Sequence, residues 1–332
     1  MSDAAPSATP FDDVRDLATR QIERDEAPAQ AVRDALLEMG REGDYGRLGE
    51  AAEWLARWQG RYPPRIENAT LGLFAGTHGI AGNNITLSSD ASTKAKVEAL
   101  RAGKAPLSAI ASQVGANIRI FELALDQPTA DFSEGPAMSE RECAATIAYG
   151  FEALEGQPDL LALGVFGAGI GTSAAAVACA LYGGTANYWV RPGPHTSRDV
   201  SAARTELVNQ ALARHRGHLD DPLEALRCLG GRELAACVGA ILAARIQSVP
   251  VVLDGFATTI AAGVVHALNP EAVAHVLPGH VTKRPAHEAA LERIGMRPLL
   301  PFEFNTGGGM GSAAAVGVLR TACAPFLGQP TG

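Results

Sequence analysis

The sequence of 332 residues has few aromatic side chains and no run of basic residues. Phe, Trp and Tyr make up 5% of the chain, and 36 Asp and Glu outnumber 28 Lys and Arg, which gives a formal net charge of −8. An acidic chain without a basic run is poorly suited to bind nucleic acid or an anionic membrane surface. We therefore expect neither a nucleic-acid partner nor a membrane partner.

The cysteines contain no CxxC pair and are odd in number: Cys143, Cys179, Cys228, Cys237 and Cys323. They predict neither a zinc site nor a disulfide framework, and they favour a reducing compartment. HExxH, a Cys/His cluster and paired carboxylates are also missing, so we expect no metal and no cofactor. The absence of GxSxG excludes the hydrolases that carry this motif, and the absence of a Walker A motif excludes the phosphate-loop NTPases. Without the pattern of a secretory signal at its start, the chain is expected to be cytoplasmic.

Residues 160–190 carry no charged side chain, and this uncharged segment is long enough to span a membrane. The segment holds six glycines, and a Gly-rich break follows its first few residues. This pattern predicts a buried strand, a loop and a buried helix rather than a membrane span.

The rest of the chain divides near residue 66. Residues 11–60 have helical spacing, with inner faces expected at Leu36, Leu37, Leu48, Leu55 and Trp58. After a Pro-Pro break, apolar runs at 71–75, 118–123, 160–166, 250–253 and 273–277 alternate with helical segments such as 139–154 and 232–247. The pattern predicts an α/β fold: an open, mostly parallel sheet with helices on both faces, plus a small helical N-terminal portion. We expect residues 1–66 to form a small helical domain, with a contribution from the C-terminus, and residues 67–332 to form the nucleotide-binding domain.

Four segments pair a strand-like run with glycines and the start of a helix: 74–86, 164–176, 253–259 and 304–315. Ligands of parallel sheets bind where strands end and helices begin. Segment 164–176 has glycines followed by Thr172 and Ser173, which favours a phosphate cradle. Its G-x-G-x-x-A spacing also permits a dinucleotide site, but an acidic residue about 20 positions on is missing. The alternative is that these glycines only allow close packing.

The other three segments carry further candidates. Four glycines in 307–311 cost chain entropy, which favours a ligand-binding loop over a structural turn. His78 follows a predicted strand, and is either a site residue or a turn residue. In GHVTKRPAH, Lys283 and Arg284 lie between two histidines. This segment is either a solvated loop or a clamp for phosphate or carboxylate.

Taken together, these motifs resemble the nicotinate-nucleotide:dimethylbenzimidazole phosphoribosyltransferase (CobT) family over nearly the whole chain. FAGTHGIAGNNIT is similar to the family's FAGDHGVAAQGVS, and LALDQPTADF, ARIQSVPVVLDGFATT and GHVTKRPAHEAALERIGMRPLL also have family counterparts. The resemblance implies transfer of phosphoribose from nicotinate mononucleotide to a benzimidazole-like base during synthesis of the cobalamin lower ligand. It also implies a homodimer; for a non-catalytic paralogue, the alternative is a heterodimer with an active family member.

The chain departs from the family where the resemblance places chemistry. The family's proposed base falls on Gly308, and no acidic residue lies between residues 160 and 190, where the family has a second glutamate. The family's glutamate in S-A-E-P-G-H becomes Arg284, and its azole-side glutamine becomes Asn83. A family lysine aligns approximately with Arg204.

Two readings follow. The chain is a divergent transferase with slow turnover or an altered acceptor, or it is a non-catalytic paralogue that binds nucleotide or cobamide precursors. For the first reading, Glu303 is the candidate catalytic carboxylate. The candidate substrate-binding residues are Thr77, His78, Asn83, Thr86, Gly169, Gly171, Thr172, Ser173, Arg204, Asp254, Gly255, His280, Lys283, Gly307, Gly308 and Gly309.

Overall fold

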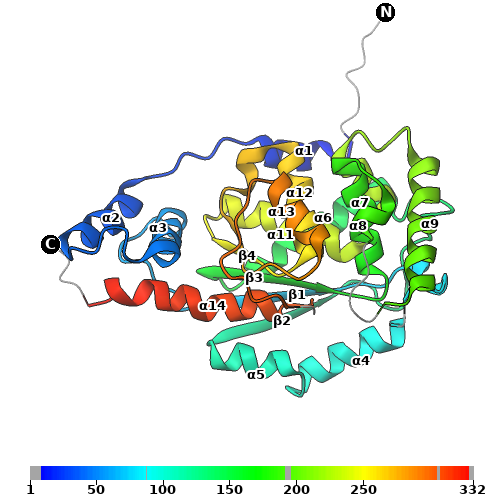
Figure 1. Ribbon diagram of the computed structural model, residues 1–332. Coiled ribbons are helices and arrows are strands. Elements are labelled where there is room, and N and C mark those ends of the chain that lie inside the picture. Colours follow the sequence, from blue (N-terminus) through cyan, green and yellow to red (C-terminus); the bar gives the residue numbers. More distant parts are fainter. Residues whose placement is uncertain (1–8, 87, 191–195, 305–306, 329–332) are drawn as a thin grey trace, which may run out of the picture.

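The computed structural model describes residues 9–86, 88–190, 196–304 and 307–328, and its centre is a five-stranded sheet (Figure 1). The strands are β1 (Ala69–Ala75), β2 (Ala116–Glu122), β3 (Leu160–Phe166), β4 (Val251–Leu253) and β5 (Val276–Pro278). All neighbours pair in parallel, in the order β2-β1-β3-β4-β5. The predicted parallel α/β fold is confirmed.

Strand β3 shows why both faces of the sheet are covered. Every one of its residues is buried, as the uncharged run predicts. Leu161, Leu163 and Val165 pack into one hydrophobic core, while Leu160 and Phe166 pack into another. The helix α7 (Ile170–Tyr182) follows after a short loop. The predicted strand, loop and buried helix in 160–190 are therefore confirmed.

Two groups of helices provide these cores. In Figure 1 the first group lies above the sheet, and the second lies below it and, for two of its helices, beyond its left end. Besides α7, the first group contains α1 (Asp12–Thr19), α6 (Glu140–Tyr149), α8 (Ala186–Trp189), α9 (Arg198–His215), α10 (Pro222–Leu229), α11 (Arg232–Ile246), α12 (Phe256–Leu268) and α13 (Pro285–Arg293). The second group contains α2 (Ala27–Glu38), α3 (Gly46–Gln59), α4 (Asp90–Arg101), α5 (Pro106–Gln113) and α14 (Met310–Cys323). Short 3-10 turns are η1 (Gly79–Gly82), η2 (Gly150–Leu154), η3 (Pro270–Val273) and η4 (Ala324–Phe326).

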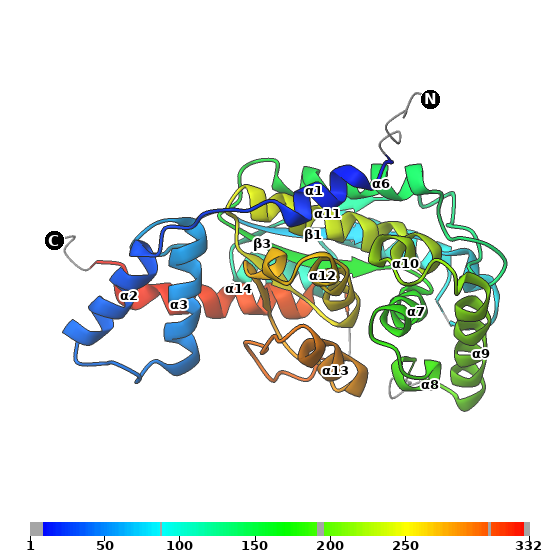
Figure 2. The ribbon, with the colours of Figure 1, turned by 90° about the horizontal axis from the view of Figure 1, so that it is seen from above.

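The N-terminal helices separate from one another. Helices α2 and α3 pack together beside the C-terminal helix α14 at one end of the molecule. Helix α1 lies apart from them, in contact with α12, and an extended segment connects it to α2 (Figure 2). Val14 and Ala18 of α1 belong to the same core as α12. The domain division at residue 66 stays a prediction.

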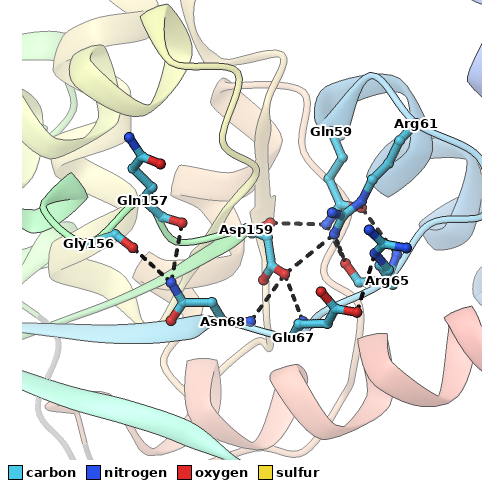
Figure 3. A network of polar contacts seen from close by, with 8 residues as sticks. All are labelled: Gln59, Arg61, Arg65, Glu67, Asn68, Gly156, Gln157 and Asp159. Carbon is cyan, nitrogen blue, oxygen red and sulfur yellow. Dashed lines mark hydrogen bonds and ion pairs between the residues drawn. The ribbon is translucent and has the colours of Figure 1, made fainter.

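A polar network fastens the end of α3 to the beginning of β1 and β3 (Figure 3). The carboxylate of Asp159 accepts hydrogen bonds from the backbone N–H groups of Glu67 (2.7 Å) and Asn68 (3.1 Å). Gln59 donates to the backbone oxygen of Asp159 (3.0 Å), and Arg61 lies 3.4 Å from its carboxylate. This network lies at the start of the strands, opposite the edge where ligands of parallel sheets bind.

Two expectations about local structure are wrong. Leu37 is 60% exposed, because the buried side of α2 is formed largely by smaller residues and Leu36. The fifth strand begins at Val276, because Pro270 opens the turn η3 in place of a strand at residue 273. All five cysteines are free and buried. Among the described helices, none is both long and apolar enough to cross a membrane.

Candidate active site

The carboxyl ends of β1, β3, β4 and β5 all reach one edge of the sheet, where a cleft of about 220 Å³ lies. Its lining comes from the loops after all four of these strands, from the first turns of α7 and α12, and from helix α9. The lining residues are Thr86, Val165, Gly167, Gly169, Ile170, Gly171, Thr172, Arg204, Asp254, Gly255, Phe256, Ala257, Thr258, Thr282, Arg284 and Gly307. We call this the first cleft.

The loop between β3 and α7 forms one wall of the first cleft. Gly169 has a φ of +96°, a conformation that glycine adopts readily, and it directly precedes the first helical residue. Gly171 lies in the first turn of α7. The N–H groups of Thr172 and Ser173 donate to the backbone oxygen of Gly169, whereas the N–H of Gly171 has no acceptor among the described residues. The positive end of the helix therefore faces the cleft, an arrangement that favours an anion.

Two arginines reach the same cleft from other elements. Arg204 belongs to α9, and Arg284 directly precedes α13, with its Nη1 atom 3.8 Å from where a Cβ at Gly171 would lie. Burial lowers the pKa of both guanidinium groups, and the charge of Arg284 lowers that of Arg204 further. Arg204 donates to the backbone oxygen of Ile85, at 2.5 Å. Neither arginine forms an ion pair with a described residue, so both charges are available to a ligand.

Asp254, directly after β4, holds the Gly-rich segment at which α14 begins. Its carboxylate accepts hydrogen bonds from the backbone N–H groups of Gly309 (2.9 Å), Gly311 (2.8 Å) and Ser312 (3.2 Å). The Nε2 atom of His280 lies 3.5 Å from it, and both side chains are buried. Burial alone would raise the pKa of Asp254, but His280 and the N–H groups together lower it. Asp254 is thus an ionised anchor for the loop.

A second cleft, of about 230 Å³, adjoins the first. The two share Val165, Gly167, Ile170 and Gly307, so they meet across the ends of the two Gly-rich loops. The remaining lining of the second cleft consists of Ser88, Ser92, Thr93, Lys96, Phe166 and Ala168. Hydroxyl groups, one aromatic ring and one ammonium group therefore surround this space.

A third feature, the pair His78–Glu233, lies behind the first cleft. The Nε2 atom of His78 is 2.6 Å from Oε1 of Glu233, and both side chains are buried. A Cβ at Gly76 would lie 2.0 Å from the carboxylate, and one at Gly231 would lie 2.3 Å from the His78 ring. Only glycine fits at both positions, so these glycines make room for the pair.

The structure brings about half of the expected binding residues together. Thr86, Gly169, Gly171, Thr172, Arg204, Asp254, Gly255 and Gly307 line the first cleft. The others lie outside the described lining of both clefts: Thr77, His78, Asn83, Ser173, His280, Lys283, Gly308 and Gly309. Residues 305 and 306 of the fourth Gly-rich segment lie outside the described residues.

Several residues outside the clefts have other partners. Ser173 donates to the backbone oxygen of Leu229 (2.8 Å), and Asn83 donates to Asp131 (2.6 Å). Lys283 and Glu303 form an ion pair with each other (3.0 Å), with side chains 59% and 58% exposed. The expected catalytic carboxylate, Glu303, therefore lies at the surface.

Sequence reasoning did not identify Lys96 or Glu233 as site residues. Lys96 lies on a helix with no motif, and Glu233 lies 155 residues from His78 along the chain. Arg284 is not among the candidate binding residues, but the reading of its segment as a clamp for phosphate or carboxylate agrees with its place in the first cleft. Glycines next to Glu233, at 230 and 231, were a signal for close packing there.

The site and its fold have known counterparts. A phosphoribosyltransferase family model matches residues 23–329. A relative from Rhizobium meliloti (strain 1021), a nicotinate-nucleotide–dimethylbenzimidazole phosphoribosyltransferase, is 44% identical over 326 residues, which cover 98% of this chain and 96% of the relative. The chain belongs to this family.

Other members of the nicotinate-nucleotide–dimethylbenzimidazole phosphoribosyltransferase family also match nearly the whole chain. A relative of the same name from Brucella canis is 43% identical, again over 98% of this chain and 96% of the relative. A crystal structure of the same enzyme from Thermus thermophilus matches with a TM-score of 0.81 and 28% identity, over 90% of this chain and 95% of that one. The family resemblance seen in the sequence is therefore confirmed.

Proposed function

We propose that the protein transfers phosphoribose from nicotinate mononucleotide to a benzimidazole-type base, as a step in synthesis of the cobalamin lower ligand. Family membership supports this reaction, because the named relatives carry that activity in their names. The observation that carries the proposal is the pair Arg204 and Arg284 beside the Gly-rich start of α7. Together they form an anion site at the edge of the sheet where ligands bind.

In this proposal, the first cleft holds the donor. The phosphate of nicotinate mononucleotide lies against the first turn of α7 and accepts hydrogen bonds from both guanidinium groups. Thr86, Thr172 and Thr282 line the same space and offer hydroxyl groups to the ribose or phosphate. The second cleft holds the acceptor, because it meets the first beside Gly167 and Gly307.

The chemistry needs little acid catalysis. Nicotinate leaves from a ring nitrogen that is already cationic, so the departing group takes the bonding electrons without needing a proton. The acceptor nitrogen attacks the ribose carbon through a free lone pair. Holding the two substrates in line therefore supplies a large part of the rate enhancement.

A neutral benzimidazole acceptor must still lose a proton after its nitrogen has attacked. Among the described residues, the site provides no free base to take that proton. Gly308, where the family resemblance places the base, has no side chain. Asp254 lines the first cleft, but its oxygens accept three backbone hydrogen bonds. We do not propose Glu303 as a replacement, since it is exposed and paired with Lys283. A positioned base contributes about 10²–10⁴-fold, so we expect slow turnover with neutral dimethylbenzimidazole or a different preferred acceptor.

The same observation supports a second candidate function. A protein that binds nicotinate mononucleotide without turning it over would keep the anion site and would not need a base. In that case the protein is a non-catalytic paralogue that binds nucleotide or cobamide precursors, or pairs with an active family member. We propose a dimer in either case, with itself or with such a member, and the mass of the protein in solution tests it.

Matched variants of two adjacent cations test the donor site. Arg284→Met removes a guanidinium group that lines the cleft, and Lys283→Met removes an exposed charge one residue away. We expect the affinity for nicotinate mononucleotide, measured by titration calorimetry, to fall by about 10- to 100-fold in Arg284→Met, because a charged hydrogen bond is lost. Lys283→Met is expected to bind like the unmodified protein. Equal affinities in all three proteins would overturn the donor site.

A further inference from the structure

Lys96 occupies the space next to the glycine at which the family resemblance places the base. Lys96 belongs to α4, and its Nζ atom lies 2.8 Å from the position that a Cβ at Gly308 would take. The same ammonium group lies 4.5 Å from the centre of the Phe166 ring. A cation over an aromatic face is attracted to it, which holds the ammonium group in the second cleft.

The charge of Lys96 is not balanced by a neighbouring carboxylate. It forms no ion pair with a described residue, and the described lining of the second cleft contains no Asp or Glu. The loss of contact with water lowers the pKa of Lys96, and the attraction of Asp254 only partly offsets this. Asp254 is not a free partner, because His280 and three backbone N–H groups already surround it. An unpaired cation beside hydroxyl groups favours an anionic ligand.

We propose that the second cleft binds the acceptor as an anion, with Lys96 as the residue that selects for its negative charge. The chemical class is a planar nitrogen heterocycle of benzimidazole size whose ring N–H is acidic enough to be lost before binding. This inference rests on the proposed function, and it names the acceptor that suits a site without a base.

The reaction balances without a proton acceptor in the protein. A ring nitrogen of the anion donates an electron pair to the anomeric carbon of the phosphoribose, and a new carbon–nitrogen bond forms. The bond from that carbon to the nicotinate nitrogen breaks, and nicotinate leaves with the bonding electrons. The ring has already lost its proton to solvent, so nothing remains for a base at position 308 to remove.

Two matched ligands separate charge from shape. 5-Nitrobenzotriazole is an anion at neutral pH, whereas 5-nitrobenzimidazole is neutral there, and the two rings differ only by a nitrogen in place of a C–H group. Titration calorimetry with the full chain measures the affinity for each. We expect the anion to bind about tenfold more tightly or better, as a charged hydrogen bond implies.

Lys96→Met is expected to abolish this preference. Lys94→Met is the matched control, because Lys94 lies on the same helix but forms an exposed ion pair with Asp126 outside the cleft. It should keep the preference. If Lys96→Met does not fold, as judged by its unfolding transition, Lys96→Gln replaces it. Equal affinity for the two ligands, an unchanged preference in the Lys96 variant, or no binding of either ligand overturns the inference.

The outcome of this test can be distinguished from the outcome of the test of the proposed function. If nicotinate mononucleotide binds and its affinity depends on Arg284, but the two rings bind equally, the proposed function stands and the role of Lys96 falls. If the anion is preferred through Lys96 but nicotinate mononucleotide does not bind, the selection of an anion by Lys96 stands, and the transferase proposal falls together with the ligand's role as acceptor.

Discussion

Two buried histidine–carboxylate pairs lie at the ligand-binding edge of the sheet, and they use their carboxylates differently. In the pair His280–Asp254, both carboxylate oxygens accept backbone hydrogen bonds from the N-cap and first turn of α14. In the pair His78–Glu233, one oxygen contacts the histidine, and Oε2 finds no partner among the described residues. The first pair thus organises a binding loop, while the second fills a tight space between Gly76 and Gly231.

This difference shows that burial of a charged residue does not by itself identify its role. Both carboxylates are buried beside a histidine, and a sequence pattern does not separate them. The number of backbone groups that each one serves does separate them. The same chemical change, carboxylate to amide, should therefore have unequal effects in the two pairs.

Asp254→Asn is expected to have the largest effect. An amide group would turn N–H atoms toward backbone N–H donors of Gly309 or Gly311, which then lose their acceptor. We expect the free energy of unfolding, measured by chemical denaturation, to fall by about 3 kcal/mol. The affinity for nicotinate mononucleotide should fall with it. A loss below about 1 kcal/mol would contradict the role of Asp254 as the loop anchor.

Gly308→Glu tests how firmly the anchored loop resists change. Gly308 has a φ of +88°, and a Cβ there would come within 2.8 Å of the Lys96 ammonium group. We expect a loss of about 2 kcal/mol in the free energy of unfolding from the strained backbone. Combining it with Lys96→Met should not recover this loss, because the strain lies in the backbone and the flexible end of Lys96 can move away from the new side chain. If the single substitution costs nothing, the loop is less constrained than its hydrogen bonds to Asp254 imply.

The pH dependence of the free energy of unfolding tests the surroundings of the His280–Asp254 pair. His287 lies beside His280, and burial holds its pKa at about 3, compared with an ordinary value of 6.5. The Nδ1 atom of His287 accepts a hydrogen bond from the backbone N–H of Thr282 (3.1 Å), and Thr282 lines the first cleft. This hydrogen bond requires the neutral histidine ring. As pH falls, the unfolded chain therefore binds a proton before the folded one does.

The contribution of the neutral His287 ring to the free energy of unfolding thus has its full value above pH 6.5, and it is lost as the pH falls toward 3. We expect this residue to contribute a slope of about 1.4 kcal/mol per pH unit in that window. Denaturation curves at several pH values measure it. In His287→Asn, which no longer titrates, the slope should be shallower by this amount. Identical slopes in the two proteins would show that His287 is not held neutral.

Glu233→Gln is expected to have the smallest effect. The amide oxygen can still accept from His78, and the NH₂ group takes the place of an oxygen that has no partner among the described residues. We expect a change of about 0.5 kcal/mol in the free energy of unfolding, and unchanged affinity for nicotinate mononucleotide. A loss as large as that of Asp254→Asn would erase the difference between the two pairs.

The sequence predicts the fold better than it predicts the site. The strand 160–166 is correct at both ends, because an apolar run that follows Pro158 and Asp159 and stops at Gly167 has few alternatives. The third Gly-rich motif correctly places Asp254 at the edge of the sheet, and the second places Gly169 in the cleft. These predictions succeed because they depend on neighbouring residues alone.

What sequence reasoning missed depends on contacts between distant segments. Lys96 matters because α4 carries it to Gly308, more than 200 positions along the chain. Glu303 was expected near the chemistry, but its backbone has a φ of +53° and its side chain pairs with Lys283 at the surface. The buried residue Glu233 carries no local signal for its partner His78. Periodicity predicts which face of an element is buried, but not which other element meets it.

The most direct test of the central claim is turnover of nicotinate mononucleotide with dimethylbenzimidazole by the purified full chain, with nicotinate and the ribotide product both quantified by chromatography. We predict slow formation of the two products in equal amounts, and their disappearance in Arg284→Met but not in Lys283→Met. Tight binding of nicotinate mononucleotide without either product, for dimethylbenzimidazole and for the anionic 5-nitrobenzotriazole alike, would contradict the transferase and leave the non-catalytic paralogue.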